Sequence, residues 1–127
     1  MVDELKINMA KMYIDEDIKK SVLEVLESGM FVGGEKSKQF EADFAKFIGS
    51  KYATSTSSGT TAITTELIAI GIRPGDEVIV PSFTFIASVS PILELGATPI
   101  FADIDPDTFC IDINDAKRKI TEKTTHQ

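Results

Sequence analysis

The segment with the clearest chemical potential is a run of hydroxyl side chains around one glycine, residues 54–61, Thr-Ser-Thr-Ser-Ser-Gly-Thr-Thr. Residues 51–56 have the composition of a short strand, and the apolar spacing of a helix follows, so Gly59 lies at a predicted strand–turn–helix junction. Free amides and the positive dipole end at a helix start favour anionic oxygens, and a glycine lets a phosphate approach the backbone. The segment predicts either a phosphate site or a helix that Ser58 simply caps.

Two aromatic residues, Phe83 and Phe85, follow a second predicted strand over residues 77–80. Ligands in open α/β sheets bind near the carboxyl ends of the strands, and an aromatic ring there can stack on a flat ligand. Phenylalanine beside a core strand is also commonly part of the core. The sequence alone leaves both interpretations open.

Four aspartates invite a metal-binding interpretation: Asp103, Asp105, Asp107 and Asp112. Their spacing is superficially that of a calcium loop, but the glycine and glutamate that such a loop needs are missing. Pro106 in the middle of the run favours a solvated turn instead. Asp103 ends a predicted strand and could still point into a site.

Other chemical groups are sparse. His126 is the sole histidine and Cys110 the sole cysteine, so neither a zinc site nor a Cys/His dyad is supported, and no disulfide can form within the chain. Gly33 and Gly34 with Lys36 form either an anion-binding loop or a plain turn between helices. No metal is expected.

The elements that must position these groups alternate between helix and strand. Helical spacing covers residues 15–28, 37–48, a stretch that ends at Gly71, and 112–120, while strands are expected over 51–56, 77–80 and 98–102. Such alternation predicts an α/β fold with a mostly parallel sheet and flanking helices. Residues 73–76, Arg-Pro-Gly-Asp, predict a type II turn before the second strand.

Two segments are less regular. Pro91 would break a helix that began near Thr84, so a kinked or late-starting helix is expected within residues 82–95. Residues 109–111 have the composition of a short additional strand.

The amino-acid composition excludes some functions for this protein. The chain has 127 residues, is 43% apolar and has a formal net charge of −7. It is therefore expected to fold, and its acidity argues against nucleic-acid or membrane-surface binding, which need clustered Lys and Arg. No signal-peptide core or membrane-length apolar stretch is present, and a cytoplasmic protein is predicted.

Taken together, the segments resemble the DegT/DnrJ/EryC1/StrS family of sugar aminotransferases, which use pyridoxal 5'-phosphate (PLP). The resemblance extends from about Ile14 to Thr124 and is strongest at residues 75–85, Gly-Asp-Glu-Val-Ile-Val-Pro-Ser-Phe-Thr-Phe. It also includes residues 28–34, 58–60 and 96–105. Each fragment alone is weak, but in this order and spacing they are specific.

The resemblance implies the large domain of fold-type I PLP enzymes. On this basis residues 1–127 are part of the large, PLP-binding domain, with 1–50 a helical segment and 51–127 the start of the α/β sheet. Gly59, Thr60 and Thr61 would hold the PLP phosphate, and Phe85 would stack on the pyridine ring. Thr61 departs from the family's usual alanine, which concerns side-chain packing rather than the backbone amide.

Family members are about three times as long as this chain. The resemblance implies that the Schiff-base lysine and the aspartate facing the pyridine nitrogen lie beyond Gln127, so the chain is expected to be an N-terminal, truncated part with no catalytic residue of its own. The isolated chain is predicted to be inactive.

The function implied for the parent protein is transfer of an amino group from an amino acid, with glutamate as the expected donor, to a nucleotide-linked keto-sugar, for polysaccharide or glycoside biosynthesis. A homodimer is implied by the same resemblance. The alternative is a non-catalytic remnant or a small α/β binding or regulatory module.

Overall fold

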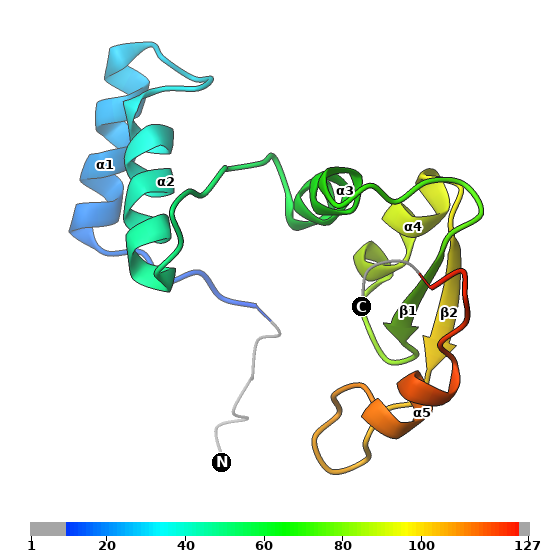
Figure 1. Cartoon of the computed structure of the whole chain (residues 1–127). Helices are drawn as coiled ribbons and strands as arrows, with labels where there is room; N and C mark the ends of the chain where they lie inside the picture. The colour runs from blue at the N-terminus through cyan, green and yellow to red at the C-terminus, as the bar shows by residue number, and fades with distance from the viewer. Residues whose placement is uncertain (1–9, 125–127) are drawn as a thin grey trace, which may run out of the picture. The chain divides into compact units, whose positions relative to one another are not determined.

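The computed structural model describes residues 10–124, and the chain divides into two units after Thr54. The first unit contains two helices, α1 (Glu16–Ser28) and α2 (Glu35–Ile48). The second contains α3 (Gly59–Ala69), β1 (Glu77–Pro81), the 3-10 turn η1 (Ile86–Ser88), α4 (Ser90–Glu94), β2 (Thr98–Ala102) and α5 (Ile113–Arg118) (Figure 1). The two units are described separately.

Local capping explains the ends of α1 and α2. The side chain of Asp15 accepts a hydrogen bond from the Ile18 amide at 2.9 Å, and α1 ends at Gly29 with φ of 68°. Helix α2 ends in the same way at Gly49, with φ of 74°. Its first residue is Glu35, two residues before the predicted start, because the extended backbone of Gly34 already serves as the N-cap.

The segment between these helices is a connecting turn. Lys36 Nζ lies 2.9 Å from Glu24 Oε2, so this cation is ion-paired with α1. The apolar residues that α1 carries on one face, Ile18, Val22 and Leu26, are 39–55% exposed.

The sheet of the second unit is parallel, as predicted. Strand β1 pairs with β2 in a register that runs from Glu77 opposite Thr98 to Pro81 opposite Ala102. Figure 1 shows the two arrows pointing the same way, with α5 beyond their heads. The α/β class is confirmed, and so is the turn before β1, where Gly75 has φ of 95° and the Asp76 amide donates to the Arg73 carbonyl at 3.2 Å.

The two edges of β1 have different partners. The Ser82 amide donates to the Ala102 carbonyl, and the Glu77 amide donates at 2.9 Å to the Lys123 carbonyl on the opposite side. Thr124 also forms an isolated parallel bridge with Glu77. Because the backbone N–H and C=O groups of alternate residues in a strand point to opposite sides, these groups of the odd-numbered residues of β1 point away from β2.

The predicted strand over residues 51–56 was wrong. These residues have no strand assignment, and Tyr52 is 75% exposed. A strand requires a neighbouring strand for its backbone groups, and within residues 10–124 none lies beside this segment. Its Ser50 hydroxyl instead donates locally to the Tyr52 carbonyl.

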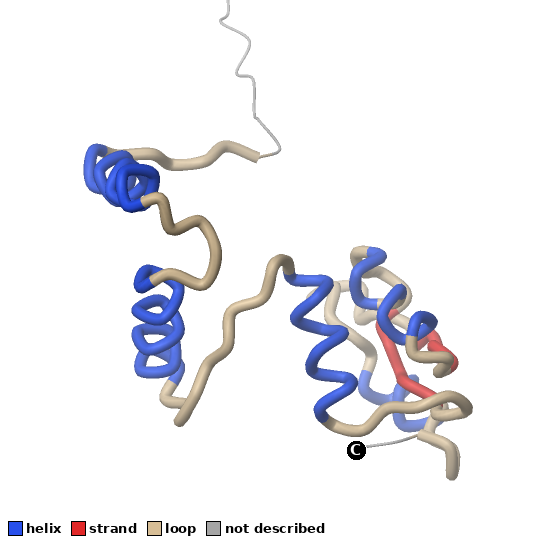
Figure 2. The backbone as a smooth tube through the Cα atoms, turned by 90° about the horizontal axis from the view of Figure 1, so that it is seen from above, coloured by secondary structure: helices blue, strands red, loops and turns tan. Residues whose placement is uncertain are grey.

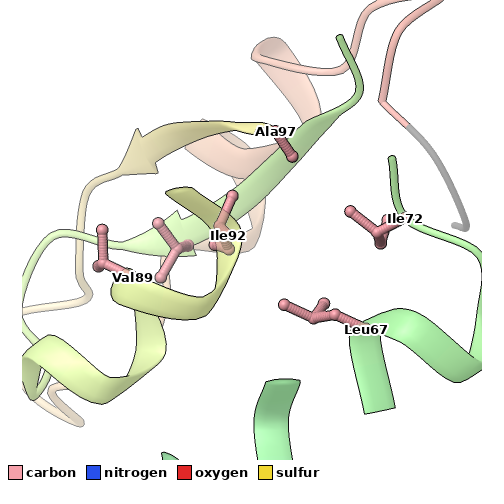
Figure 3. Packing of buried hydrophobic residues seen from close by; sticks show 6 residues of the cluster. Leu67, Ile72, Val89, Ile92 and Ala97 are labelled. Carbon is pink, nitrogen blue, oxygen red and sulfur yellow. The ribbon is translucent and has the colours of Figure 1, made fainter. Parts of the chain in front are cut away.

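The core of the second unit lies between the helices and one face of the sheet. Helix α3 contacts both η1 and α4, and α4 contacts β2. Figure 3 shows Leu67 and Ile72 facing Val89, Ile92 and Ala97 across this core. Val80 of β1 completes the buried cluster. Figure 2 shows the two strands, in red, side by side beneath helical segments of this unit.

The irregular segments resolve as follows. A late-starting helix is confirmed, because η1 precedes α4 and Pro91 occupies the first turn of α4. Residues 109–111 form no strand: Phe109 has φ of 58°, and only Ile111 pairs, in a single bridge with Ile104. The helix predicted over residues 112–120 is present as α5, which Asp112 caps and which ends at Arg118, two residues early. Within residues 10–124, no helix has the length and apolarity needed to span a membrane.

Candidate functional site

The start of α3 presents two unpaired backbone donors. Ser58, in extended conformation, caps the helix: its hydroxyl accepts from the Thr61 amide at 3.1 Å and its carbonyl accepts from the Ala62 amide at 3.0 Å. The amides of Gly59 and Thr60 donate to no acceptor in the described part of the chain, residues 10–124. This 11-residue helix therefore directs two free N–H groups and its positive dipole end outward.

Hydroxyl groups shape the loop that leads into α3. Thr61 Oγ1 lies 3.0 Å from Ser58 Oγ and 3.3 Å from Ser57 Oγ. The Thr56 hydroxyl donates to the Ser58 carbonyl at 3.0 Å. The turn is thus fixed by its own side chains before any ligand arrives.

Gly59 leaves open space above this turn. A Cβ atom built on Gly59 would meet no heavy atom within 4 Å, and its φ is not in the left-handed region. The glycine is therefore required neither by internal packing nor by backbone strain. Its effect is to keep the approach to the two free amides clear.

Phe85 lies on an element that contacts α3. It precedes η1 with φ of −77° and ψ of 146°, and its side chain is 74% exposed. Helix α3 and the 3-10 turn η1 that follows Phe85 contact each other within the second unit.

The structure gives the three predicted phosphate-site residues different properties. The amides of Gly59 and Thr60 are free, whereas the Thr61 amide is already bonded to Ser58. Thr61 contributes its hydroxyl to the cluster with Ser57 and Ser58. The roles of Ser57 and Thr56 in shaping the loop were not anticipated from the sequence, where they are two hydroxyl residues among many.

The acidic segment forms a turn, as predicted. One Asp105 oxygen accepts hydrogen bonds from the amides of Asp107 and Thr108, each at 2.9 Å. Hydrogen bonds from the Thr108 and Asp107 amides and from the Thr108 hydroxyl lower the pKa of Asp105. In the part of the chain that the structure describes, no three acidic, histidine or cysteine residues gather as metal ligands would.

A buried carboxylate that the sequence did not reveal lies beside this turn. Asp115 is 6% exposed and accepts from the Asp103 amide at 2.7 Å, while Lys119 Nζ and Arg118 Nη2 lie 2.7 and 2.9 Å from its oxygens. The Lys119 hydrogen bond, together with those from Asp103 and Arg118, lowers the pKa of Asp115 to about 2. Asp103 is thus held through its backbone, and its side chain is exposed.

Four further side chains complete the description of the residues named earlier. The Phe83 and Phe109 rings pack with centroids 5.9 Å apart, although both remain more than 60% exposed. Cys110 is a free, exposed thiol. His126 lies outside the described residues.

Comparison with known proteins shows the family to which the chain belongs. The sequence profile of the DegT/DnrJ/EryC1/StrS aminotransferase family matches residues 12–126. The chain belongs to this family. The predicted family membership is confirmed, and the match includes both the start of α3 and Phe85.

Curated members of the DegT/DnrJ/EryC1/StrS family are considerably longer. The chain is 41% identical over 112 residues to GDP-perosamine synthase of Vibrio cholerae, a match that covers 87% of this chain and 30% of the relative. It is 43% identical over 109 residues to 3-oxo-glucose-6-phosphate:glutamate aminotransferase of Bacillus subtilis (strain 168), covering 86% of this chain and 25% of that protein. The chain spans about a quarter to a third of the relatives it matches.

Solved family structures share the fold. An aminotransferase from Psychrobacter cryohalolentis matches with a TM-score of 0.83 and 38% identity, covering 88% of this chain and 29% of that one. An E coli GDP-4-keto-6-deoxy-D-mannose-3-dehydratase, solved with bound hydrated PLP, matches with a TM-score of 0.84 and 38% identity, covering 91% and 31%. The predicted fold class, that of PLP-dependent aminotransferases, is confirmed.

Proposed function

We propose that residues 55–124 supply the phosphate-binding turn and ring-stacking face of a pyridoxal 5'-phosphate site. The observation that carries this proposal is the pair of unpaired amides, Gly59 and Thr60, at the start of α3 beneath open space. It is supported by a relative of the same fold whose structure holds PLP.

The donor set fits the cofactor. A phosphate ester presents several anionic oxygens, and two free amides with a helix dipole are suited to bind them. In the proposal the amides of Gly59 and Thr60 bind the phosphate, and Thr61 contributes through its hydroxyl. The exposed ring of Phe85 has the flat apolar face that stacking on a pyridine ring requires.

These residues would anchor and orient the cofactor. PLP, when bound, supplies the electron sink for chemistry at an amino-acid carbon. Gly59 and Thr60 would fix one end of the group by its charge, and Phe85 would hold the ring in one plane while covering one face against water. No residue of this chain is assigned to proton transfer.

For the whole protein we propose transfer of an amino group from an amino acid, with glutamate as donor, to a nucleotide-linked keto-sugar in polysaccharide or glycoside biosynthesis. The names of the GDP-perosamine synthase and glutamate aminotransferase relatives support this substrate class. A cytoplasmic homodimer is part of the same proposal.

The solved dehydratase relative is a reason to test a second reaction as well, elimination of a sugar hydroxyl. An assay of the full-length protein with a GDP-linked keto-sugar and glutamate separates the two reactions. Formation of an amino-sugar with 2-oxoglutarate supports the aminotransferase, and loss of the sugar hydroxyl supports the dehydratase.

The phosphate site is tested by titrating nitrogen-15-labelled chain with inorganic phosphate and then with PLP. The amides of Gly59 and Thr60 are expected to shift saturably. Gly59→Val is expected to abolish these shifts and leave the amide signals far from residue 59 unchanged, because a Cβ atom at this position meets no heavy atom within 4 Å and the fold can accept it. The amides of Glu35 and Lys36 at the start of α2 are the internal control. Equal shifts at both helix starts would contradict a specific site.

We also propose that the lysine which binds the cofactor covalently lies outside these 127 residues. The chain mixed with PLP is then expected to show no stoichiometric absorbance band from a lysine-bound cofactor. A saturable band that disappears when one particular lysine is changed to arginine would refute this part of the proposal.

A further inference from the structure

Two hydroxyl groups bracket Phe85 and have no part in the site as described so far. Thr84 Oγ1 and Ser88 Oγ lie 2.9 Å apart, on either side of Phe85 in the chain. The Ser88 amide also donates to the Phe85 carbonyl at 2.9 Å. Two hydrogen bonds therefore stabilise the turn that contains Phe85, one between main-chain atoms and one between side chains.

Packing alone does not hold this aromatic ring. Phe85 is 74% exposed, and within residues 10–124 its ring stacks on no other aromatic ring. The first buried residue after Phe85 in the chain is Val89, which is 7% exposed and belongs to the core. Between Val89 and the ring, the direction of Phe85 depends on the conformation of residues 84–88.

We propose that Thr84 and Ser88 are positioning residues whose hydroxyl–hydroxyl bond fixes the direction in which Phe85 presents its ring to the pyridine ring of the cofactor. The inference rests on the proposed cofactor site and adds two residues to it. Neither hydroxyl contacts the cofactor in this assignment, and both act through Phe85.

A positioning role and a structural role predict different effects on stability and on ligand affinity when the hydroxyl is removed. A single exposed hydroxyl–hydroxyl bond contributes little to the free energy of unfolding. Its loss would leave the fold and the phosphate-binding amides intact and would loosen only the stacked ring. Affinity for PLP should therefore fall, while affinity for inorganic phosphate, which lacks a ring, should not.

The experiment compares the two probes, PLP and inorganic phosphate, on the 127-residue chain and its variants, with affinities read from the Gly59 and Thr60 amide shifts. Thr84→Val and Ser88→Ala are each expected to weaken PLP binding by about two- to tenfold, the net effect of one hydrogen bond. The double variant should be no weaker than either single variant, because both remove the same bond. Phosphate affinity should stay unchanged, and Thr84→Ser should retain wild-type behaviour.

The matched control is Thr65→Val, which removes a threonine hydroxyl bonded at 2.8 Å to the Thr61 carbonyl within α3 and not bonded to residues 84–88. It should leave PLP affinity unchanged. The proposal is overturned if Thr84→Val leaves PLP affinity unchanged, or if it weakens phosphate and PLP equally.

A second readout separates this inference from the proposed function. Fluorine NMR of chain labelled with fluorophenylalanine, with the Phe85 signal assigned by Phe85→Leu, reports the ring without any ligand. If the wild-type chain binds neither probe, the proposed function fails. The positioning role is then decided by whether Thr84→Val and Ser88→Ala change the Phe85 signal while Thr65→Val does not; an unchanged signal overturns it.

Discussion

Replacing Ile92 with alanine is expected to lower the free energy of unfolding of the second unit by about 2–5 kcal/mol. Ile92 is 2% exposed and packs in the cluster with Leu67, Val80 and Val89, so the truncation leaves a cavity between α4 and the rest of the core. Because the total stability of a small domain is only about 5–15 kcal/mol, this loss is a large fraction of the stability that the unit has. Urea unfolding followed by circular dichroism measures the change.

The neighbouring residue provides the control. Leu93 is 58% exposed, and Leu93→Ala should change the unfolding free energy by about 0.5 kcal/mol or less. Similar losses for the two variants would contradict the assignment of Ile92 to the core and of Leu93 to the surface.

Replacing Asp115 with asparagine is expected to destabilise the second unit at neutral pH and to remove part of its acid sensitivity. The charged carboxylate accepts from the Asp103 amide and pairs with Lys119 and Arg118, tying α5 to the end of β2. Lys119 also donates to the Phe101 carbonyl at 2.6 Å, so the loss of its charge partner affects the strand itself.

The direction of the pH dependence follows from the lowered pKa. The Asp115 pKa falls from 3.8 to about 2 on folding, so the unfolded chain takes up a proton more readily than the folded one. The stabilisation is complete above about pH 4 and is lost as the pH falls toward 2. Thermal unfolding from pH 7 to pH 2 should show a wild-type advantage over Asp115→Asn that is largest at neutral pH and shrinks below pH 4.

Asp105 serves as the comparison, because hydrogen bonds also lower its pKa and it lies in the same unit. Asp105→Asn should remove a separate part of the acid sensitivity, and the double variant should remove more than either single change. An Asp115→Asn curve parallel to the wild-type curve from pH 7 to pH 2 would rule out this contribution.

The sequence predicted elements whose causes are local. Helices α1 and α2 end at the predicted residues, before Gly29 and Gly49 in left-handed conformations, and residues 73–76 form the expected turn, since each depends on only a few neighbouring residues. The failures depend on distant partners. Residues 51–56 have strand composition but no neighbouring strand, and composition does not reveal what lies beside a segment.

The same distinction applies to the site. Phosphate binding and helix capping were alternatives for residues 54–61, and the structure contains the cap together with two free amides, because Ser58 uses only the Thr61 and Ala62 amides. The amide of Thr61, by contrast, is bonded to the Ser58 hydroxyl. Burial of Asp115 could not be predicted, because its partner, the Asp103 amide, lies 12 residues earlier, beyond the helical spacing of α5.

The constant register of the sheet has a consequence for the order of folding. Every residue of β1 pairs with the residue 21 positions later, from Glu77 with Thr98 to Pro81 with Ala102, and the intervening segment supplies Val89 and Ile92 to the core. The entropy of closing a loop grows slowly with its length, and contacts of short sequence separation form fast. During synthesis, which proceeds from the N-terminus, the strand–helix–strand segment from β1 to β2 has the partners that lie within it as soon as residue 102 leaves the ribosome, although Lys123 and Thr124 join Glu77 later. The end of the sheet that carries Phe85 can therefore assemble as an early nucleus, before residues 103–124 have emerged from the ribosome.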